Sequence, residues 1–231
     1  TMAGPASHVS LLELYTSEGC NTCPPAEEWI SKLQQDRRLW TQLVPVTLHV
    51  DYWDNLGWKD PFDSHAYTER QQQIAGEAHS LAGMVIYTPQ FVLDGRDWRG
   101  WVNDKPLQVD DSAKLGPLVL TADGRKVTVR FSPTQPRSEA LQVHVVLMAF
   151  GVDVPVGAGE NKGATLRHDF LAVADAGAAL KQDLHGAYQG VLTLPRPVAV
   201  KAARYALAAW VSASGSPLPI QATGGWLKAQ P

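Results

Sequence analysis

The first half of the chain alternates between apolar runs and segments with helical spacing. Residues 9–15 form an apolar run that predicts a buried strand. Apolar residues at helical spacing then predict a helix over residues 25–37, and Pro25 suits the first position of a helix. A second apolar run at residues 44–51 is typical of a central strand in a parallel sheet. These segments predict one βαβ unit, whose crossover is expected to be right-handed.

The pattern then changes from apolar runs to mixed segments. Residues 51–62 combine aromatic and charged side chains and predict a long loop, and a helix is expected over residues 64–81. Residues 87–101 predict a hairpin with Asp94-Gly95 at its turn. A short helix within residues 107–115 is expected to close this half.

The second half of the chain has the pattern of an all-β segment. After residue 116, residues 118–131 predict a hairpin, and short alternating runs predict further strands at 140–150, 165–173, 188–194, 204–212 and 217–222. Residues 157–163 are rich in glycine and predict a turn. The sequence therefore predicts two domains, an α/β domain at residues 8–116 and a β-rich, sandwich-like domain at residues 117–231.

Composition fits this picture and excludes some functions. The 231 residues are 45% hydrophobic, which supports a packed core, and the net charge is −3. Because no long basic run occurs, we expect no nucleic-acid partner. No apolar stretch approaches the roughly 20 residues that span a bilayer, so we expect no membrane span. No signal peptide is visible at residues 1–4.

The two cysteines carry the clearest chemistry. Cys20 and Cys23 are three residues apart, between the first predicted strand and the first predicted helix. A helix N-terminus presents unpaired N–H groups and a positive dipole end, both of which favour a thiolate. A bond across so small a loop adds little stability, so redox chemistry explains the pair better than stapling. We expect Cys20, at the open edge, to attack a disulfide, and Cys23 to resolve the mixed disulfide.

Two further segments are expected at the same sheet edge as the cysteines. In the 51–62 loop, Trp53 and Trp58 are candidates for substrate binding; alternatively, these rings pack under the loop as a small core. Thr88 and Pro89 begin the predicted hairpin, where the backbone of Thr88 would pair with an extended substrate peptide. Alternatively, Pro89 only starts an edge strand.

Three carboxylates near these segments are candidates for a proton relay to the resolving thiol. They are Glu18, beside the first cysteine, and Asp51 and Asp54 in the long loop. Simple exposure to solvent is the alternative for each of them. The order of the segments places all three near the predicted carboxyl edge of the sheet, where ligands bind in open α/β sheets.

Metal binding by the cysteines is a rival chemistry. Two thiolates and an imidazole suit Cu(I). The candidates for the further ligand are His49, His65, His79 and Met84. None has a short fixed spacing from the cysteines, and a four-ligand zinc motif is absent. We therefore assign no metal ligand and no cofactor from the sequence.

Several motifs resemble an uncharacterised bacterial family of secreted thioredoxin-like proteins, catalogued as a domain of unknown function. They are CNTCPP at residues 20–25, HVDYWD at 49–54 and YTPQ at 87–90. Gly159-Glu160-Asn161 matches as well, with Leu166 and His168 downstream. The resemblance implies a thioredoxin-like domain, with a central mixed sheet flanked by helices, and a β-rich extension. It also implies a periplasmic or secreted location and a cis bond before Pro89.

These observations lead to one interpretation and two alternatives. The interpretation is a thiol–disulfide oxidoreductase of the cell envelope that uses Cys20 and Cys23. It would act on a protein or small-molecule disulfide with a redox partner that the sequence does not identify. The alternatives are a non-enzymatic binding module on a thioredoxin-like scaffold, and a copper-binding protein or metallochaperone.

Overall fold

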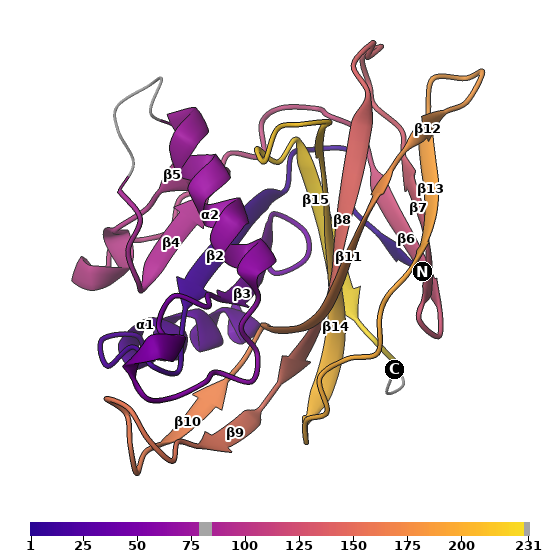
Figure 1. Ribbon diagram of the computed structural model, residues 1–231. Coiled ribbons are helices and arrows are strands. Elements are labelled where there is room, and N and C mark those ends of the chain that lie inside the picture. Colours follow the sequence, from indigo (N-terminus) through magenta and orange to yellow (C-terminus); the bar gives the residue numbers. More distant parts are fainter. Residues whose placement is uncertain (79–84, 229–231) are drawn as a thin grey trace.

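The fold is β-rich, and its two α-helices lie beside the N-terminal strands β2 (Ser10–Thr16), β3 (Leu43–His49) and β4 (Gln90–Leu93) (Figure 1). The structure is a computed structural model that describes residues 1–78 and 85–228. Its described strands form an eight-stranded sheet, a five-stranded sheet and a two-stranded hairpin. No helix in these two ranges is long and apolar enough to cross a membrane, consistent with the sequence prediction.

The eight-stranded sheet joins strands from both halves of the chain. Its order is β15 (Gln221–Trp226), β14 (Arg204–Ala213), β8 (Leu141–Phe150), β11 (Leu171–Ala179), β3 (Leu43–His49), β2 (Ser10–Thr16), β4 (Gln90–Leu93) and β5 (Arg96–Asp97). Strand β2 is parallel to β3 and antiparallel to β4. The halves meet where β11 lies parallel to β3, with Leu171 opposite Thr47.

The second sheet also takes a strand from the N-terminus. Its order is β1 (Met2–Ala3), β6 (Leu118–Asp123), β7 (Lys126–Phe131), β13 (Tyr188–Thr193) and β12 (Lys181–Gln182). The remaining strands, β9 (Val152–Pro155) and β10 (Thr165–His168), form a hairpin that lies beside helix α1 (Figure 1). The division into residues 8–116 and 117–231 stays a prediction, and both segments contribute strands to the eight-stranded sheet.

The eight-stranded sheet is buried on both faces, which explains its long apolar strands. On β8, alternate side chains enter two different cores. Val146, Met148 and Phe150 join the core that also contains Ile30 of α1. Val143, Val145, Leu147 and Ala149 join the core that it shares with the five-stranded sheet. Alternation between two faces is the pattern of a strand. Burial of each of the valine, leucine, methionine and phenylalanine side chains is worth about 1.5–3 kcal/mol.

The first α-helix is shorter than the sequence pattern predicts. Helix α1 covers Pro24–Ser31 and continues as a 3₁₀ turn, η1 (Lys32–Gln35), so Pro24 takes the first helical position. Helix α2 covers His65–Ala78; the last three positions of the predicted 64–81 helix lie outside the described residues. Two further 3₁₀ turns are η2 (Asp54–Leu56) and η3 (Gly100–Asn103).

Three predictions about secondary structure are wrong in detail. Residues 107–115 form no helix, because their backbone bonds to the N-terminal segment instead: His8 N–H donates to the Ala113 carbonyl at 2.8 Å. The strand expected at 165–173 is divided into β10 and β11 at Phe170, whose φ is +54°. The last strand begins at Gln221 rather than at residue 217.

Candidate functional site

The cysteine pair lies where β2 is followed by α1, as the sequence predicts. Cys20 and Cys23 form a disulfide with their Cα atoms 5.4 Å apart. Cys20 lies in the turn before the helix, and Cys23 is the N-cap residue of α1. Cys23 therefore stands at the N-terminal end of α1, where the helix dipole favours negative charge. The first two helical residues are prolines without an N–H, and the N–H groups of Ala26 and Glu27 donate to the Cys23 carbonyl at 3.0 and 3.2 Å.

Both sulfur-bearing side chains are fully buried, which corrects the expectation of an open edge at Cys20. The relative exposure of each cysteine is 0%. The two residues between them, Asn21 and Thr22, are exposed and form the outer surface of the turn. Because a disulfide sulfur carries no proton, the Thr22 hydroxyl is the donor in its 3.5 Å contact with Sγ of Cys20. A substrate therefore reaches the disulfide only if a covering segment moves.

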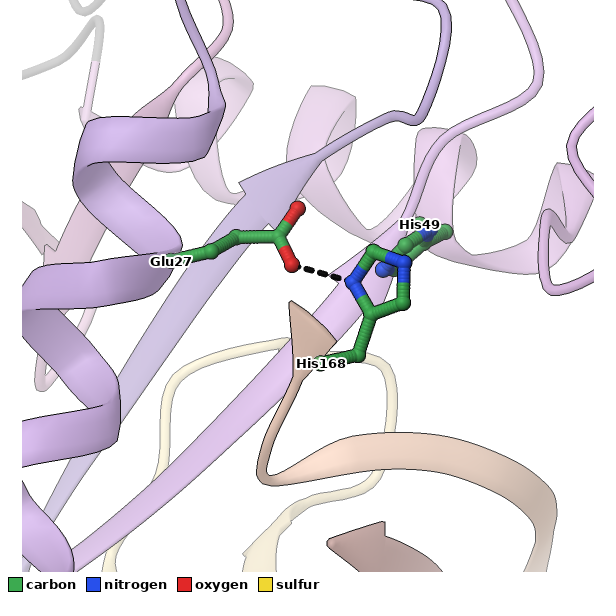
Figure 2. A group of neighbouring side chains, drawn as sticks. All are labelled: Glu27, His49 and His168. Atoms are coloured by element: carbon green, nitrogen blue, oxygen red, sulfur yellow. Dashed lines mark hydrogen bonds and ion pairs between the residues drawn. The ribbon is translucent and has the colours of Figure 1, made fainter. Parts of the chain in front are cut away.

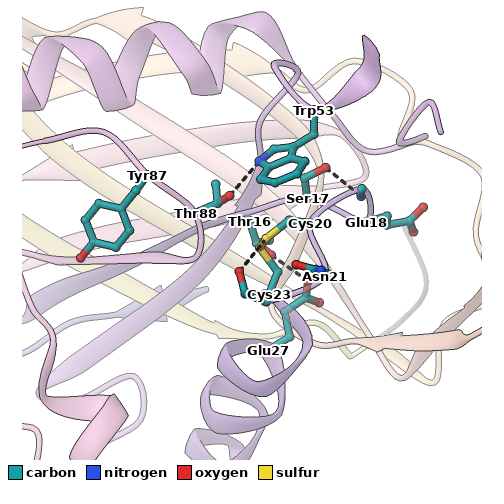
Figure 3. The surroundings of a disulfide bond; sticks show 12 residues. Thr16, Ser17, Glu18, Cys20, Asn21, Cys23, Glu27, Trp53, Tyr87 and Thr88 are labelled. Carbon is teal, nitrogen blue, oxygen red and sulfur yellow. Dashed lines mark hydrogen bonds between the residues drawn. A yellow bond between two sulfur atoms is a disulfide. The ribbon is translucent and has the colours of Figure 1, made fainter. Parts of the chain in front are cut away.

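The long loop and the 88–89 turn meet beside the disulfide (Figure 3). The indole N–H of Trp53 donates to Oγ1 of Thr88 at 2.7 Å. A Cβ on Gly19 would lie 3.2 Å from Cβ of Trp53. The cysteine turn and Trp53 are therefore in close contact. The peptide bond between Thr88 and Pro89 is cis, as predicted, and Pro89 is buried. Trp53 and Thr88 thus lie near the cysteines, as the sequence analysis expected.

The loop between β9 and β10 also covers the cysteine turn, which sequence reasoning missed. The side-chain amide of Asn161 donates to the backbone carbonyls of Glu18 at 2.7 Å and of Cys20 at 3.0 Å. A weaker contact joins the Asn21 N–H to the Glu160 carboxylate at 3.4 Å. The glycine-rich sequence of residues 157–163 predicts a turn here, and only the family resemblance of residues 159–161 pointed to this loop.

Trp58 supports the loop between β9 and β10. Cβ atoms on Gly157 and Gly159 would lie 3.1 Å from atoms of Trp58, so the glycines allow the loop to rest on this residue. The indole N–H of Trp58 donates to Oε2 of Glu18 at 2.7 Å. Trp58 therefore holds a buried carboxylate and supports the covering loop.

Beneath the cysteine turn lies a buried group of charged side chains from distant parts of the sequence. The His168 imidazole donates from Nδ1 to the Glu27 carboxylate (Figure 2) and from Nε2 to Oε1 of Glu18 at 3.1 Å. Oε1 of Glu27 accepts a hydrogen bond from the Thr16 hydroxyl at 2.9 Å. Glu27 and Thr16 belong to the surroundings of the disulfide in Figure 3.

The charges in this group shift the pKa values of its members. Burial alone lowers the pKa of His168, but the Glu27 and Glu18 carboxylates outweigh burial and raise it to about 10. Burial raises the pKa of Glu27, but the His168 charge and hydrogen bond outweigh that effect and lower it. His168 is therefore a buried cation between two carboxylates in this structure.

A second buried pair adjoins the first. The His49 imidazole donates from Nδ1 to Oδ2 of Asp60 at 2.6 Å, and its ring centroid lies 5.0 Å from that of His168. Asp60 also accepts the N–H groups of Glu18 at 2.8 Å and Phe62 at 2.9 Å. Burial lowers the pKa of His49 and raises that of Asp60. Their mutual attraction outweighs both effects, so the pKa of His49 rises and that of Asp60 falls.

Only one of the three predicted relay carboxylates joins this group. Glu18 is fully buried in it, whereas Asp51 and Asp54 make other pairs. Asp51 accepts the Thr68 hydroxyl at 2.6 Å, and Asp54 binds Nζ of Lys59 at 2.8 Å. Asp51 and Asp54 stay outside the buried group because nearby partners in the loop and in α2 already bind both carboxylates.

The histidines proposed as copper ligands are separated in the structure. His49 is fully buried, whereas His65 is exposed on α2 and pairs with Asp51 at 2.8 Å. His79 and Met84 lie outside the described residues. The sequence analysis identified His49 only as a rival metal ligand. Asp60 entered only as one of the polar residues of the long loop and His168 only through the family resemblance, and Glu27 received no role.

A separate cavity of about 430 Å³ lies between α2 and the eight-stranded sheet. Its lining includes Arg70, His144, Asp175 and Trp210. The His144 and Trp210 rings are stacked, with centroids 5.3 Å apart. None of the residues around the disulfide or in the buried charged group lines this cavity, so it is a distinct feature of the fold.

Comparison with known proteins gives a family and a fold. The chain belongs to the family described as "Protein of unknown function (DUF1223)", which matches residues 11–212. No match was found among curated proteins.

Two solved structures are similar in fold. A crystal structure of an Agrobacterium tumefaciens protein is 22% identical, with a TM-score of 0.59 over 97% of each chain. HBP35 of Porphyromonas gingivalis is 14% identical, with a TM-score of 0.61 over 99% of this chain and 78% of the other. At these identities, the likeness is one of fold.

Proposed function

We propose that this protein is a thiol–disulfide oxidoreductase whose N-terminal part is thioredoxin-like and whose redox pair is Cys20 and Cys23. The observation that carries the proposal is the position of the disulfide, at the end of a central strand and at the N-terminus of α1. Such a position favours the thiolate that the reaction needs. The proposed location is the periplasm or the exterior, where a disulfide persists.

The arrangement of the N-terminal elements supports the thioredoxin-like assignment. Strand β2 is central, with β3 parallel on one side and the β4–β5 hairpin antiparallel on the other. Helix α1 connects β2 to β3 and contributes Ile30 to the core of this sheet. The cysteine turn and the Thr88-Pro89 turn then lie side by side around Trp53, as a peptide-binding edge requires.

The proposed reaction transfers two electrons from the dithiol to a substrate disulfide. The Cys20 thiolate attacks one substrate sulfur, an S–S bond forms between them, and the other substrate sulfur leaves as a thiolate. The Cys23 thiolate then attacks Sγ of Cys20, which re-forms the disulfide and releases the second substrate thiolate. Both substrate thiolates take up protons. The Cys20 and Cys23 thiols supply these protons when they ionise to thiolates.

A trapping experiment tests the proposal directly. The reduced wild type is expected to reduce insulin, and Cys20→Ser is expected to abolish that activity. Cys23→Ser retains the attacking thiol, so it is expected to accumulate a mixed disulfide with a model disulfide substrate, and Cys20→Ser is its matched control. If Cys20→Ser reduces insulin or oxidises thiols at the wild-type rate, the mechanism is wrong.

The burial of both sulfurs favours one second candidate, a binding module in which the disulfide is structural. The two functions differ in the accessibility of the sulfurs. A redox pair cycles between dithiol and disulfide, and its reduced form is alkylated rapidly by iodoacetamide near neutral pH. A structural pair resists reduction by dithiothreitol until the protein unfolds.

A further inference from the structure

Three buried side chains from three different elements converge under the cysteine turn. Glu27 comes from the first turn of α1, His49 from the end of β3 and His168 from the end of β10 (Figure 2). One potential ligand atom of each lies within 4.8 Å of those of the other two. All three side chains are buried. Two imidazoles and a carboxylate are donors that suit divalent transition metals.

His49 has a free nitrogen in this position. Its Nδ1 is bonded to Asp60 at 2.6 Å, whereas its Nε2 has no hydrogen-bond partner among the described residues. The residue is 0% exposed, so this nitrogen is fully enclosed. Buried polar atoms without a partner are uncommon, because each loses its interaction with water without replacement. In Figure 2 the His49 ring lies behind the His168 ring.

The outer contacts of the two imidazoles are those of metal-binding histidines. His49 donates from Nδ1 to Asp60 at 2.6 Å, and His168 donates from Nε2 to Glu18 at 3.1 Å. A metal-bound histidine commonly donates its other N–H to such a carboxylate, which fixes the ring and makes the ligand more basic. The remaining nitrogens are then Nε2 of His49 and Nδ1 of His168, and the latter already contacts Glu27.

The charge of the cluster favours a cation. Three carboxylates, those of Glu18, Glu27 and Asp60, are each at most 5% exposed. A buried carboxylate is strongly destabilising unless a positive charge or several hydrogen bonds offset it. Without a metal, protonation of the imidazoles supplies this positive charge. A divalent ion that displaces those protons from His49 and His168 would instead offset two of the three negative charges.

We propose that Glu27, His49 and His168 form a binding site for a divalent transition-metal ion of the Zn²⁺ class, with Glu18 and Asp60 orienting the histidines. Metal–ligand distances of about 2.0–2.1 Å imply roughly 3.3 Å between donor atoms in a tetrahedral site. Separations of at most 4.8 Å therefore require only small side-chain movements. The proposal goes beyond the proposed redox function, because neither cysteine is a ligand and the disulfide can stay closed.

The test uses the oxidised, untagged protein, so that neither thiols nor a histidine tag bind the ion. Absence of free thiols is checked first, and the protein is then titrated with ZnCl₂ by calorimetry. We expect one Zn²⁺ per chain. Glu27→Gln keeps the size of the side chain but removes the charge, and it is expected to weaken binding at least 100-fold. Glu18→Gln changes only an outer contact and is expected to weaken binding by about 10- to 100-fold.

A surface histidine serves as the matched control. His65 is exposed and pairs with Asp51, so His65→Gln is expected to bind Zn²⁺ as the wild type does. Absence of binding by the folded wild type would overturn the proposal, and so would loss of binding in His65→Gln or wild-type affinity in Glu27→Gln.

X-ray absorption of the zinc-loaded wild type gives a second test that needs no variant. We expect two imidazole nitrogens at about 2.0–2.1 Å, with oxygen as the remaining ligand type. This measurement decides the question even if Glu27→Gln fails to fold. A sulfur shell near about 2.3 Å, or a single imidazole, would contradict the proposed site.

Discussion

The Asn161 side chain donates a 3.0 Å hydrogen bond to the backbone carbonyl of Cys20, from a position 141 residues further along the chain. The contact joins the loop between β9 and β10 to the turn that carries the disulfide. A second hydrogen bond, to the Glu18 carbonyl at 2.7 Å, strengthens it. We therefore expect this loop to control access to the two buried sulfurs.

The first prediction concerns this loop. Asn161→Ala removes both hydrogen bonds, so the loop opens more often and the disulfide is reduced faster by dithiothreitol. Each hydrogen bond is worth roughly 0.5–1.5 kcal/mol, so an increase of about 5- to 100-fold in the reduction rate is expected. Lys162→Ala, at an exposed neighbouring position, is the control and should leave the rate unchanged. Equal rates for wild type and Asn161→Ala would argue against a covering role.

The second prediction concerns a buried ion pair between β2 and α2. Glu13 accepts Nε of Arg70 at 2.6 Å and one terminal nitrogen at 3.1 Å, and it also accepts the Tyr15 hydroxyl at 2.8 Å. Arg70→Met leaves the Glu13 charge buried and should lower the free energy of unfolding by about 3–5 kcal/mol. Urea denaturation measures this loss.

The double variant is the control for this pair. Glu13→Gln combined with Arg70→Met removes both charges and is expected to be more stable than Arg70→Met alone. A double variant that is less stable than the single one would contradict the assignment of the loss to an uncompensated charge.

The third prediction concerns pH. Burial, with a contribution from the Arg70 charge, lowers the pKa of His144 to about 4. The unfolded chain, with an ordinary histidine pKa near about 6.5, therefore binds more protons between these values. The contribution of His144 to the free energy of unfolding is therefore present in full above about pH 6.5. It falls as the pH falls toward about 4, by at most about 1.4 kcal/mol per pH unit.

His144→Gln removes this dependence. Its loss of unfolding free energy between pH 7 and pH 4.5 is expected to be smaller than that of the wild type, by about 2.4 kcal/mol. The exposed His185, changed to Gln, is the control. Parallel pH profiles for wild type and His144→Gln would show that the His144 pKa does not differ between the folded and unfolded states.

The fourth prediction contrasts two glycines. Gly76 is exposed in α2, and a Cβ there would meet nothing within 4 Å, so Gly76→Ala should stabilise the protein by about 0.5–1 kcal/mol. A Cβ on Gly224 of β15 would lie 2.6 Å from the Trp40 ring and 2.9 Å from the Leu207 carbonyl oxygen. Gly224→Ala should therefore destabilise by about 1–3 kcal/mol. Thermal unfolding of both variants tests the signs, and a stabilised Gly224→Ala would refute the contact.

Local sequence signals predicted the parts of the site that depend on neighbouring residues. Cys20 and Cys23 stand between a strand and a helix because an apolar run, a turn and a proline-initiated helix follow one another directly. The 107–115 segment misled the prediction for the opposite reason: its pairing with residues 6–8 depends on a distant part of the chain.

The charged cluster needed contacts that a single sequence does not specify. His168 meets Glu27 across 141 residues and Glu18 across 150, so no spacing motif joins them. The sequence instead pointed to Asp51 and Asp54, whose partners are only 5 to 17 residues away. Their acidity was visible in the sequence, but the burial that perturbs a pKa was not.

The place of β11 beside β3 has a consequence for synthesis of the protein. When Thr47 leaves the ribosome, its strand partner Leu171 is still more than a hundred residues away, a delay on the order of 10 s at about 5–20 residues per second. During that time β3 has an unpaired edge, which is prone to pair with other chains. A fragment that ends near residue 116 would keep that edge permanently. Expression of the N-terminal segment alone is therefore expected to give aggregates, which matters for any chaperone that meets the growing chain.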